Sequence, residues 1–147
     1  MFEILRRGTV ALVAAAGLVA LLPATSWADN TLAKNRAVIQ VSDANPATWS
    51  LALNNAKNVQ DDLGGPDGVE LEIVAYGPGL GMLKGNSPLA ARVADALKNG
   101  IKVVACENTM HAQKLVAADM LPAIGYVPAG VVELMMKQQQ GYAYIRP

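Results

Sequence analysis

The stretch that decides the fold is Lys102-Val103-Val104-Ala105-Cys106-Glu107-Asn108-Thr109-Met110. Its first five residues are mostly apolar and β-branched, which predicts a buried strand over 102–106. Asn108 or Thr109 then caps a helix that we expect to run to about Val116. A buried strand that passes directly into a helix is typical of an α/β protein with a parallel sheet.

The same alternation of strand and helix extends through the chain on both sides of this stretch. Short apolar runs predict further strands over 37–41, 69–76, 124–127 and 142–145, the last at an edge of the sheet. Helices are predicted over 46–63, 88–99 and 130–140, with a short turn over 118–121. This order predicts an α/β fold, a three-layer α/β/α sandwich on a mostly parallel five-stranded sheet with right-handed crossovers.

Two of these helices have clear start signals. Asn45 is a typical N-cap residue and Pro46 suits the first helical position, while Ser87 and Pro88 form the same pair further along. Glycines at 64 and 100 follow the two helices and end them. The inward face of the first helix is predicted to carry Trp49, Ala52, Leu53, Ala56, Val59 and Leu63.

Composition excludes several classes of protein. A chain of 147 residues allows one domain, and 52% hydrophobic residues exclude disorder. Twelve basic residues are balanced by twelve acidic ones, so we expect no nucleic-acid partner. One cysteine and one histidine exclude a disulfide framework and a Cys/His zinc module. We expect no metal and no cofactor.

The first 28 residues have the pattern of a secretory signal peptide. Arg6 and Arg7 precede an apolar run over 9–22, and Ser26-Trp27-Ala28 supplies small residues at the cleavage positions. The run has 14 residues and spans only about 21 Å, which is too short to cross a bilayer. We therefore predict a signal peptide over 1–28, a polar lead-in over 29–35 and one domain over 36–147. The mature protein is expected in the periplasm, without a membrane anchor.

Ligands of open parallel sheets bind outside the carboxyl ends of the strands. Three segments are predicted to lie there: Ser42-Asp43, Gly77–Met82 and Cys106–Met110. The loop around Tyr126 connects to the last long helix on the same side. The candidate pocket residues are therefore Asp43, Gly77, Gly79, Glu107, Asn108, Thr109 and Tyr126.

The glycine segment after the second strand does not match a nucleotide-binding motif. Its spacing, Gly77-x-Gly79-x-Gly81, is neither G-x-G-x-x-G nor a P-loop. Glycines permit close approach of the backbone to another group. The favoured interpretation is that this group is a neighbouring segment of the same chain.

Cys106 is the candidate catalytic residue, and two interpretations of it are equally weighted. A lone cysteine at the end of an apolar strand is often a small buried hydrophobe. At a strand-to-helix junction, however, the following N–H groups favour a thiolate, which is the reactive form. Glu107 opposes this, because an adjacent carboxylate raises the pKa of a thiol.

His111 follows Cys106 closely enough to raise two further hypotheses. A Cys–His pair can support nucleophilic catalysis, but no third orienting group is evident, so an exposed helix histidine is favoured. Cys106, Met110 and His111 include copper-preferred donors, yet a blue-copper site needs a second histidine that this chain lacks. No metal site is therefore predicted.

Other polar and sulfur-containing side chains are predicted to be structural. The carboxylates interpreted as surface charge are Asp61, Asp62, Glu70 and Glu72. Met135 and Met136 lie on the last helix, where core packing or a subunit interface explains them better than a cofactor.

Four segments considered together carry a family resemblance: Val38–Asp43, Tyr76–Gly79, Val104–Met110 and Gly125–Val131. They resemble the DsrE/DsrF-like family, and the similarity covers nearly all of the chain after the leader. It is nearest to exported, single-domain members whose cysteine lies in a C-x-N-T-M motif, here Cys106–Met110.

This resemblance implies a three-layer α/β/α sandwich and a homo-oligomer, a trimer or a hexamer. It also implies that Cys106 accepts a persulfide and passes the sulfur to a partner, so that a sulfur donor or acceptor protein is expected. The resulting hypothesis is an exported sulfur carrier or sulfurtransferase-like protein. The alternative is a non-catalytic ligand-binding or structural oligomeric module in which Cys106 merely packs in the core.

Overall fold

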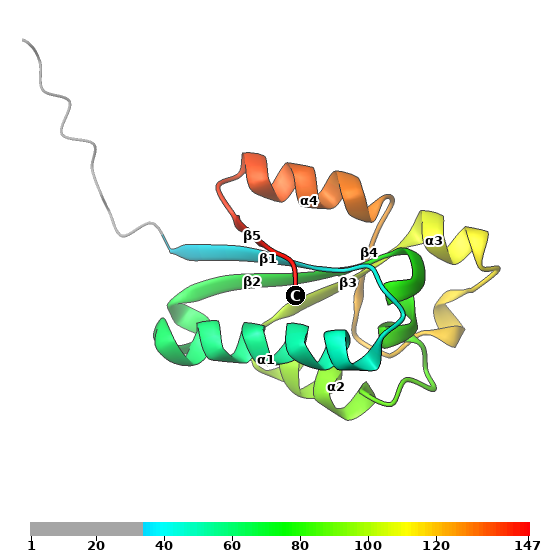
Figure 1. The fold of residues 1–147 in the computed structure, drawn as a ribbon, viewed down its shortest axis with the longest axis horizontal. Helices are drawn as coiled ribbons and strands as arrows, with labels where there is room; N and C mark the ends of the chain where they lie inside the picture. The colour runs from blue at the N-terminus through cyan, green and yellow to red at the C-terminus, as the bar shows by residue number, and fades with distance from the viewer. Residues whose placement is uncertain (1–33) are drawn as a thin grey trace, which may run out of the picture. The chain divides into compact units, whose positions relative to one another are not determined.

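The computed structural model describes residues 34–147 (Figure 1). The predicted signal peptide, 1–28, and residues 29–33 of the lead-in over 29–35 lie outside these residues. Within 34–147, no helix combines the length and the apolar character needed to cross a membrane.

The domain is built on one sheet of five parallel strands. The strands are β1 (Asn35–Val41), β2 (Val69–Ala75), β3 (Lys102–Cys106), β4 (Gly125–Val127) and β5 (Ala143–Ile145). Their order is β4-β3-β2-β1-β5, and every neighbouring pair is parallel. The predicted five-stranded parallel sheet is confirmed, and β5 lies at an edge as expected, where its neighbour is β1.

Helices cover both faces of this sheet. They are α1 (Pro46–Asp62), α2 (Ala90–Lys98), α3 (Glu107–Ala112) and α4 (Gly130–Gln139). Short 3-10 turns are η1 (Gly65–Asp67), η2 (Gly77–Leu83) and η3 (Ala117–Asp119). Figure 1 shows α1 and α2 on one face, α4 alone on the other, and α3 beside the end of β3. The predicted three-layer sandwich is therefore confirmed.

The two faces carry cores of very different size. The larger core lies between the sheet and α1 and α2, and it includes Ile39, Ile73, Leu80 and Val103. The smaller core lies under α4 and consists of Val38, Val74, Val104, Leu134 and Tyr142. Within α4 only Gly130 and Leu134 are buried, so apolar contacts hold this helix at few points.

The start of α1 follows the predicted capping pattern. The Asn45 side-chain oxygen accepts a hydrogen bond from the Ala47 N–H at 3.0 Å, and Pro46 occupies the first turn. The inward face buries Trp49 and Leu53 as expected. Leu63 was predicted to be inward and is 40% exposed, because the helix ends at Asp62 before it.

Two helices, α2 and α3, have boundaries that differ from prediction. Helix α2 begins at Ala90 rather than at 88, because the Ser87 hydroxyl accepts from the Leu89 N–H in a turn ahead of it. Helix α3 begins at Glu107, so that Cys106 takes the capping position in place of Asn108 or Thr109. It ends at Ala112 rather than near Val116, and Lys114 then takes a left-handed φ of 56°.

Candidate functional site

Cys106 is both the last residue of β3 and the residue that precedes α3. Side chains alternate between faces along a strand, so its thiol projects to the same face as Val104. Val104 belongs to the small core under α4. Cys106 is only 5% exposed. The thiol therefore lies at the carboxyl edge of the sheet, on the face covered by α4.

Four groups near the thiol lower its pKa as hydrogen-bond donors. They are the hydroxyl and N–H of Thr109, the N–H of Asn108 and the N–H of Gly130. Burial by itself raises the pKa of Cys106, but these donors outweigh it, and the pKa lies below the ordinary thiol value. Glu107 was expected to raise the pKa of the thiol. It does not decide the direction of the shift, because the neutral donors lower the pKa.

The donors from α3 and α4 are brought together by a contact between their leading loops. The Asn108 N–H donates to the Pro128 carbonyl at 3.1 Å, which joins the start of α3 to the loop before α4. Gly130 can approach because it has no side chain: a Cβ there would lie 2.9 Å from Tyr76 Cβ. The close packing of α4 on the end of β2 thus brings the Gly130 N–H to the thiol.

The loop after β2 supports the same arrangement. The Gly77 N–H donates to Thr109 Oγ1 at 3.0 Å, and Gly77 has a φ of 53°, in the region that favours glycine. A Cβ at Gly79 would lie 2.3 Å from the Val41 carbonyl oxygen. Gly79 therefore allows η2 to approach the end of β1. This agrees with the favoured interpretation, in which the glycines accommodate a neighbouring segment of the same chain.

Asp43 lies at the start of α1 and has structural partners there. One of its carboxylate oxygens accepts from the Asn45 N–H at 2.9 Å, and its carbonyl accepts from Trp49 Nε1 at 2.7 Å. These bonds orient the beginning of the helix. Asp43 is not among the groups that act on the thiol.

Glu107 and Tyr126 line a pocket that does not include the thiol. Tyr126 pairs with Ala105 and Val127 pairs with Cys106, so that Tyr126 projects to the face opposite the thiol. This pocket, of about 300 Å³, is lined by Glu107, Met110, His111, Leu115, Val116, Ala117 and Tyr126. His111 is exposed on the surface, as favoured above. The structure thus places Asn108 and Thr109 at the thiol, with Gly77 bonded to Thr109, and separates Glu107 and Tyr126 from it.

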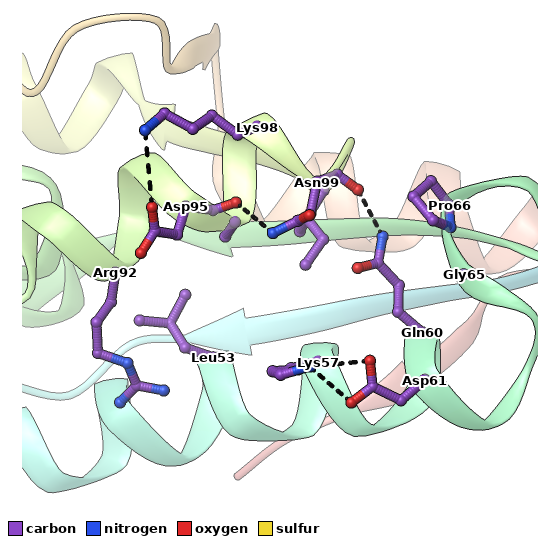
Figure 2. Close-up of a pocket in the computed structure, with 12 residues that line it drawn as sticks. Leu53, Lys57, Gln60, Asp61, Gly65, Pro66, Arg92, Asp95, Lys98 and Asn99 are labelled. Atoms are coloured by element: carbon purple, nitrogen blue, oxygen red, sulfur yellow. Dashed lines mark hydrogen bonds and ion pairs between the residues drawn. The ribbon is translucent and has the colours of Figure 1, made fainter.

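A larger groove, of about 500 Å³, lies between α1 and α2 (Figure 2). Its wall includes Asn99 and Ile101, which precede β3, so it is at the opposite end of that strand from Cys106. Figure 2 shows two ion pairs in it, Lys57 with Asp61 and Lys98 with Asp95. Arg92 donates to Ser50 and Asn54 of α1. The groove is an interhelical surface whose charged groups largely satisfy one another.

Sequence reasoning missed one buried charged group. Glu72 was predicted to be surface charge and is 3% exposed, because α4 covers this part of β2. Its Oε2 lies 2.8 Å from Lys137 Nζ, and Glu133 Oε1 lies 3.6 Å from the same nitrogen. Burial raises the pKa of Glu72 above its ordinary value despite the ion pair. Alternation of Glu70 and Glu72 with apolar residues is the pattern of a half-exposed strand, so no local signal marks this burial.

Among residues 34–147, no group of three or more His, Cys, Asp or Glu side chains is arranged to hold a metal ion. The site is therefore a single thiol with four neutral donors, at the carboxyl edge of an open parallel sheet. These features define a class: three-layer α/β proteins with one cysteine at the end of a strand.

The DsrE/DsrF-like family model matches residues 36–147, and the chain belongs to this family. The structure of MTH1491 from Methanobacterium thermoautotrophicum, a protein of unknown function, is similar to that of this chain, with a TM-score of 0.73. The two sequences are 30% identical, and the match covers 77% of this chain and 99% of MTH1491. BT1422 from Bacteroides thetaiotaomicron, also of unknown function, shares the fold at 15% identity and a TM-score of 0.63, over 77% of this chain and 95% of its own. No curated protein matches the chain.

Proposed function

We propose that the protein is a sulfur carrier, with sulfurtransferase-like chemistry, that accepts a persulfide sulfur on Cys106. The observation that carries the proposal is the set of donors from Thr109, Asn108 and Gly130, which lowers the pKa of the thiol despite its burial. A thiolate is the form that attacks sulfur. Membership of the DsrE/DsrF-like family supports the same assignment.

The proposed step leaves the overall oxidation state unchanged. The Cys106 thiolate attacks the outer sulfur of a donor persulfide, R–S–SH, and forms a new Sγ–S bond. The S–S bond of the donor breaks, and its electron pair leaves with the inner sulfur as R–S⁻. The proton stays on the transferred sulfur, so that Cys106–S–SH is the product. The chain has no second cysteine that would resolve this persulfide as an internal disulfide.

Intact-mass measurement tests this chemistry. The reduced protein is incubated with inorganic polysulfide under anaerobic conditions, and we expect an adduct of one sulfur atom that dithiothreitol removes. The Cys106→Ser variant is the control and should gain nothing. Failure of the native protein to form the adduct, or the same adduct on the serine variant, would contradict the proposal.

The second candidate function is a non-catalytic ligand-binding or structural module. The observation in its favour is that Cys106 is only 5% exposed, as expected of a cysteine that packs in a core. Maleimide labelling separates the two functions. Labelling of the native protein at a rate near that of the unfolded chain supports the sulfur carrier, whereas labelling only after unfolding supports the packed residue.

We also infer that the protein is a homo-oligomer, a trimer or a hexamer, that uses the outer face of α4. This face carries four large apolar side chains that are about half exposed: Val131, Val132, Met135 and Met136. Their exposure excludes core packing within the chain as the explanation of the two methionines. Contiguous apolar exposure of this kind marks interaction surfaces.

The proposed place of action is the periplasm, after cleavage of residues 1–28. The support is the charged start, apolar run and small-x-small site of the N-terminal sequence. Its sulfur donor and acceptor would then be proteins or small thiols of that compartment. Fractionation of cells that express the full chain should recover a periplasmic form beginning at Asp29, and an intact chain in the cytoplasm would contradict this.

A further inference from the structure

A buried ion pair joins α4 to the sheet on the face that holds the thiol. The side chains of Glu72, on β2, and Lys137, on α4, are 4% and 12% exposed. Lys137 Nζ also lies 4.9 Å from the centre of the Tyr142 ring. The second carboxylate oxygen of Glu72 is buried and has no hydrogen-bond partner among the described residues. Such a pair is costly to desolvate, so breaking it from one side leaves an uncompensated charge.

The same helix has few other attachments. Leu134 is its one large side chain in the small core, and Gly130 packs on Tyr76 at its first turn. The outward residues of α4 do not contact the sheet, because they are exposed. The position of the helix thus depends on an apolar contact in its middle, a glycine contact at its start and the ion pair near its end.

We propose that Glu72 and Lys137 are positioning residues for Cys106: their ion pair holds α4 on the sheet and so keeps the Gly130 N–H against the thiol. The inference rests on the proposed use of Cys106 as a thiolate. Neither residue touches the thiol, and both act through the placement of α4.

For Glu72, this role predicts an effect on the thiol opposite in sign to that of simple electrostatics. Glu72 faces Lys137 and Glu133 from α4 and Tyr142 from the segment before β5, whereas the thiol faces neutral donors. Through space, loss of the Glu72 carboxylate would favour a thiolate, and loss of the Lys137 ammonium would disfavour it. Through the position of α4, both losses withdraw the Gly130 N–H and disfavour the thiolate.

The experiment measures iodoacetamide alkylation of Cys106 against pH in Glu72→Gln and Lys137→Met. We expect both variants to lose at least about threefold in rate at pH 7, with profiles shifted to higher pH. Glu72→Leu combined with Lys137→Met removes both charges and should restore much of the rate, since an apolar pair docks the helix without a buried charge. Asp61→Asn, which breaks an exposed ion pair on α1, is the matched control and should change nothing.

An unchanged or faster rate in folded Glu72→Gln would overturn the positioning role. If that variant does not fold, Glu72→Asp decides the matter: it keeps the charge but shortens the reach, and we expect a smaller shift in the same direction. An unchanged profile in Glu72→Asp would then overturn the role. The readout is thiol reactivity with a small alkylating reagent, so it stands even if no persulfide forms on the native protein.

Discussion

Gly130 lies directly against Tyr76, so closely that a Cβ on residue 130 would come within 2.9 Å of Tyr76 Cβ. Real Cβ atoms do not approach each other to this distance, so only glycine fits here. The contact places the first turn of α4 on the end of β2 and aims the Gly130 N–H at Cys106. Gly130 therefore serves both the packing of α4 on the sheet and the hydrogen bonding of the thiol.

Gly130→Ala should accordingly impair both stability and the site. The added methyl group forces α4 away from Tyr76, which we expect to cost about 1–3 kcal/mol in the free energy of unfolding. The displaced N–H should also slow alkylation of Cys106 at pH 7. Chemical denaturation and the alkylation rate test the two effects. Gly85→Ala is the control, because its nearest neighbour would be 3.4 Å away and little change is expected.

Thr109 should control both the thiol and the loop after β2. Thr109→Val removes the hydroxyl that faces Cys106 and leaves the Gly77 N–H without its acceptor. We expect a loss of about 1–3 kcal/mol in unfolding free energy and a higher pKa of the thiol. Thr109→Ser keeps the hydroxyl and should retain both properties. Equal reactivity of the valine and serine variants, measured by alkylation against pH, would contradict this.

Glu70 should make stability depend on pH in the acid range. Hydrogen bonds from Tyr142 and Lys102 lower the pKa of Glu70 from 4.5 to about 2. A carboxyl group with a lowered pKa stabilises the fold above its unfolded pKa, and this contribution is lost as the pH falls through about 2. The side chain is 32% exposed, so solvent screening limits the effect to about 1 kcal/mol. Denaturation of Glu70→Gln and the native protein should differ at pH 6 and converge near pH 2, and a constant difference would refute the assignment.

The apolar outer face of α4 should govern assembly. Met135→Lys combined with Met136→Lys puts two charges into the proposed interface, and we expect light scattering to report a smaller particle than the native oligomer. Asn58→Lys combined with Ala94→Lys adds the same charge to exposed positions of α1 and α2, on the opposite face of the sheet, and should assemble normally. A monomeric native protein, or an unchanged mass in the methionine variant, would refute this interface.

Much of the fold could be predicted because its signals are local. A β-branched apolar run such as Val103-Val104 identifies a buried strand without reference to the rest of the chain. Asn45 and Pro46 likewise mark the start of α1 by backbone chemistry alone. The end of α3 was predicted incorrectly, because the left-handed residue after the helix is Lys114 and not the glycine that usually marks such a turn.

The candidate site could be predicted only in part. The sequence identified Cys106 and the segments that follow the strands, since the carboxyl ends of parallel strands meet at one edge. It grouped Tyr126 with the thiol, although the register of β3 and β4 places them on opposite faces. The burial of Glu72 was missed because it depends on α4, a helix more than 50 residues away along the chain.

The sequence by itself determined the alternation of strands and helices, the parallel sheet, the family and the single thiol, because each follows from short-range pattern and composition. Only the tertiary structure decided which groups face that thiol and which charges are buried. Those properties arise where α4 crosses back over the sheet and brings Gly130 to Tyr76 and Lys137 to Glu72. Hydrogen bonding and desolvation act over a few ångströms in space, and distance along the chain does not reveal them.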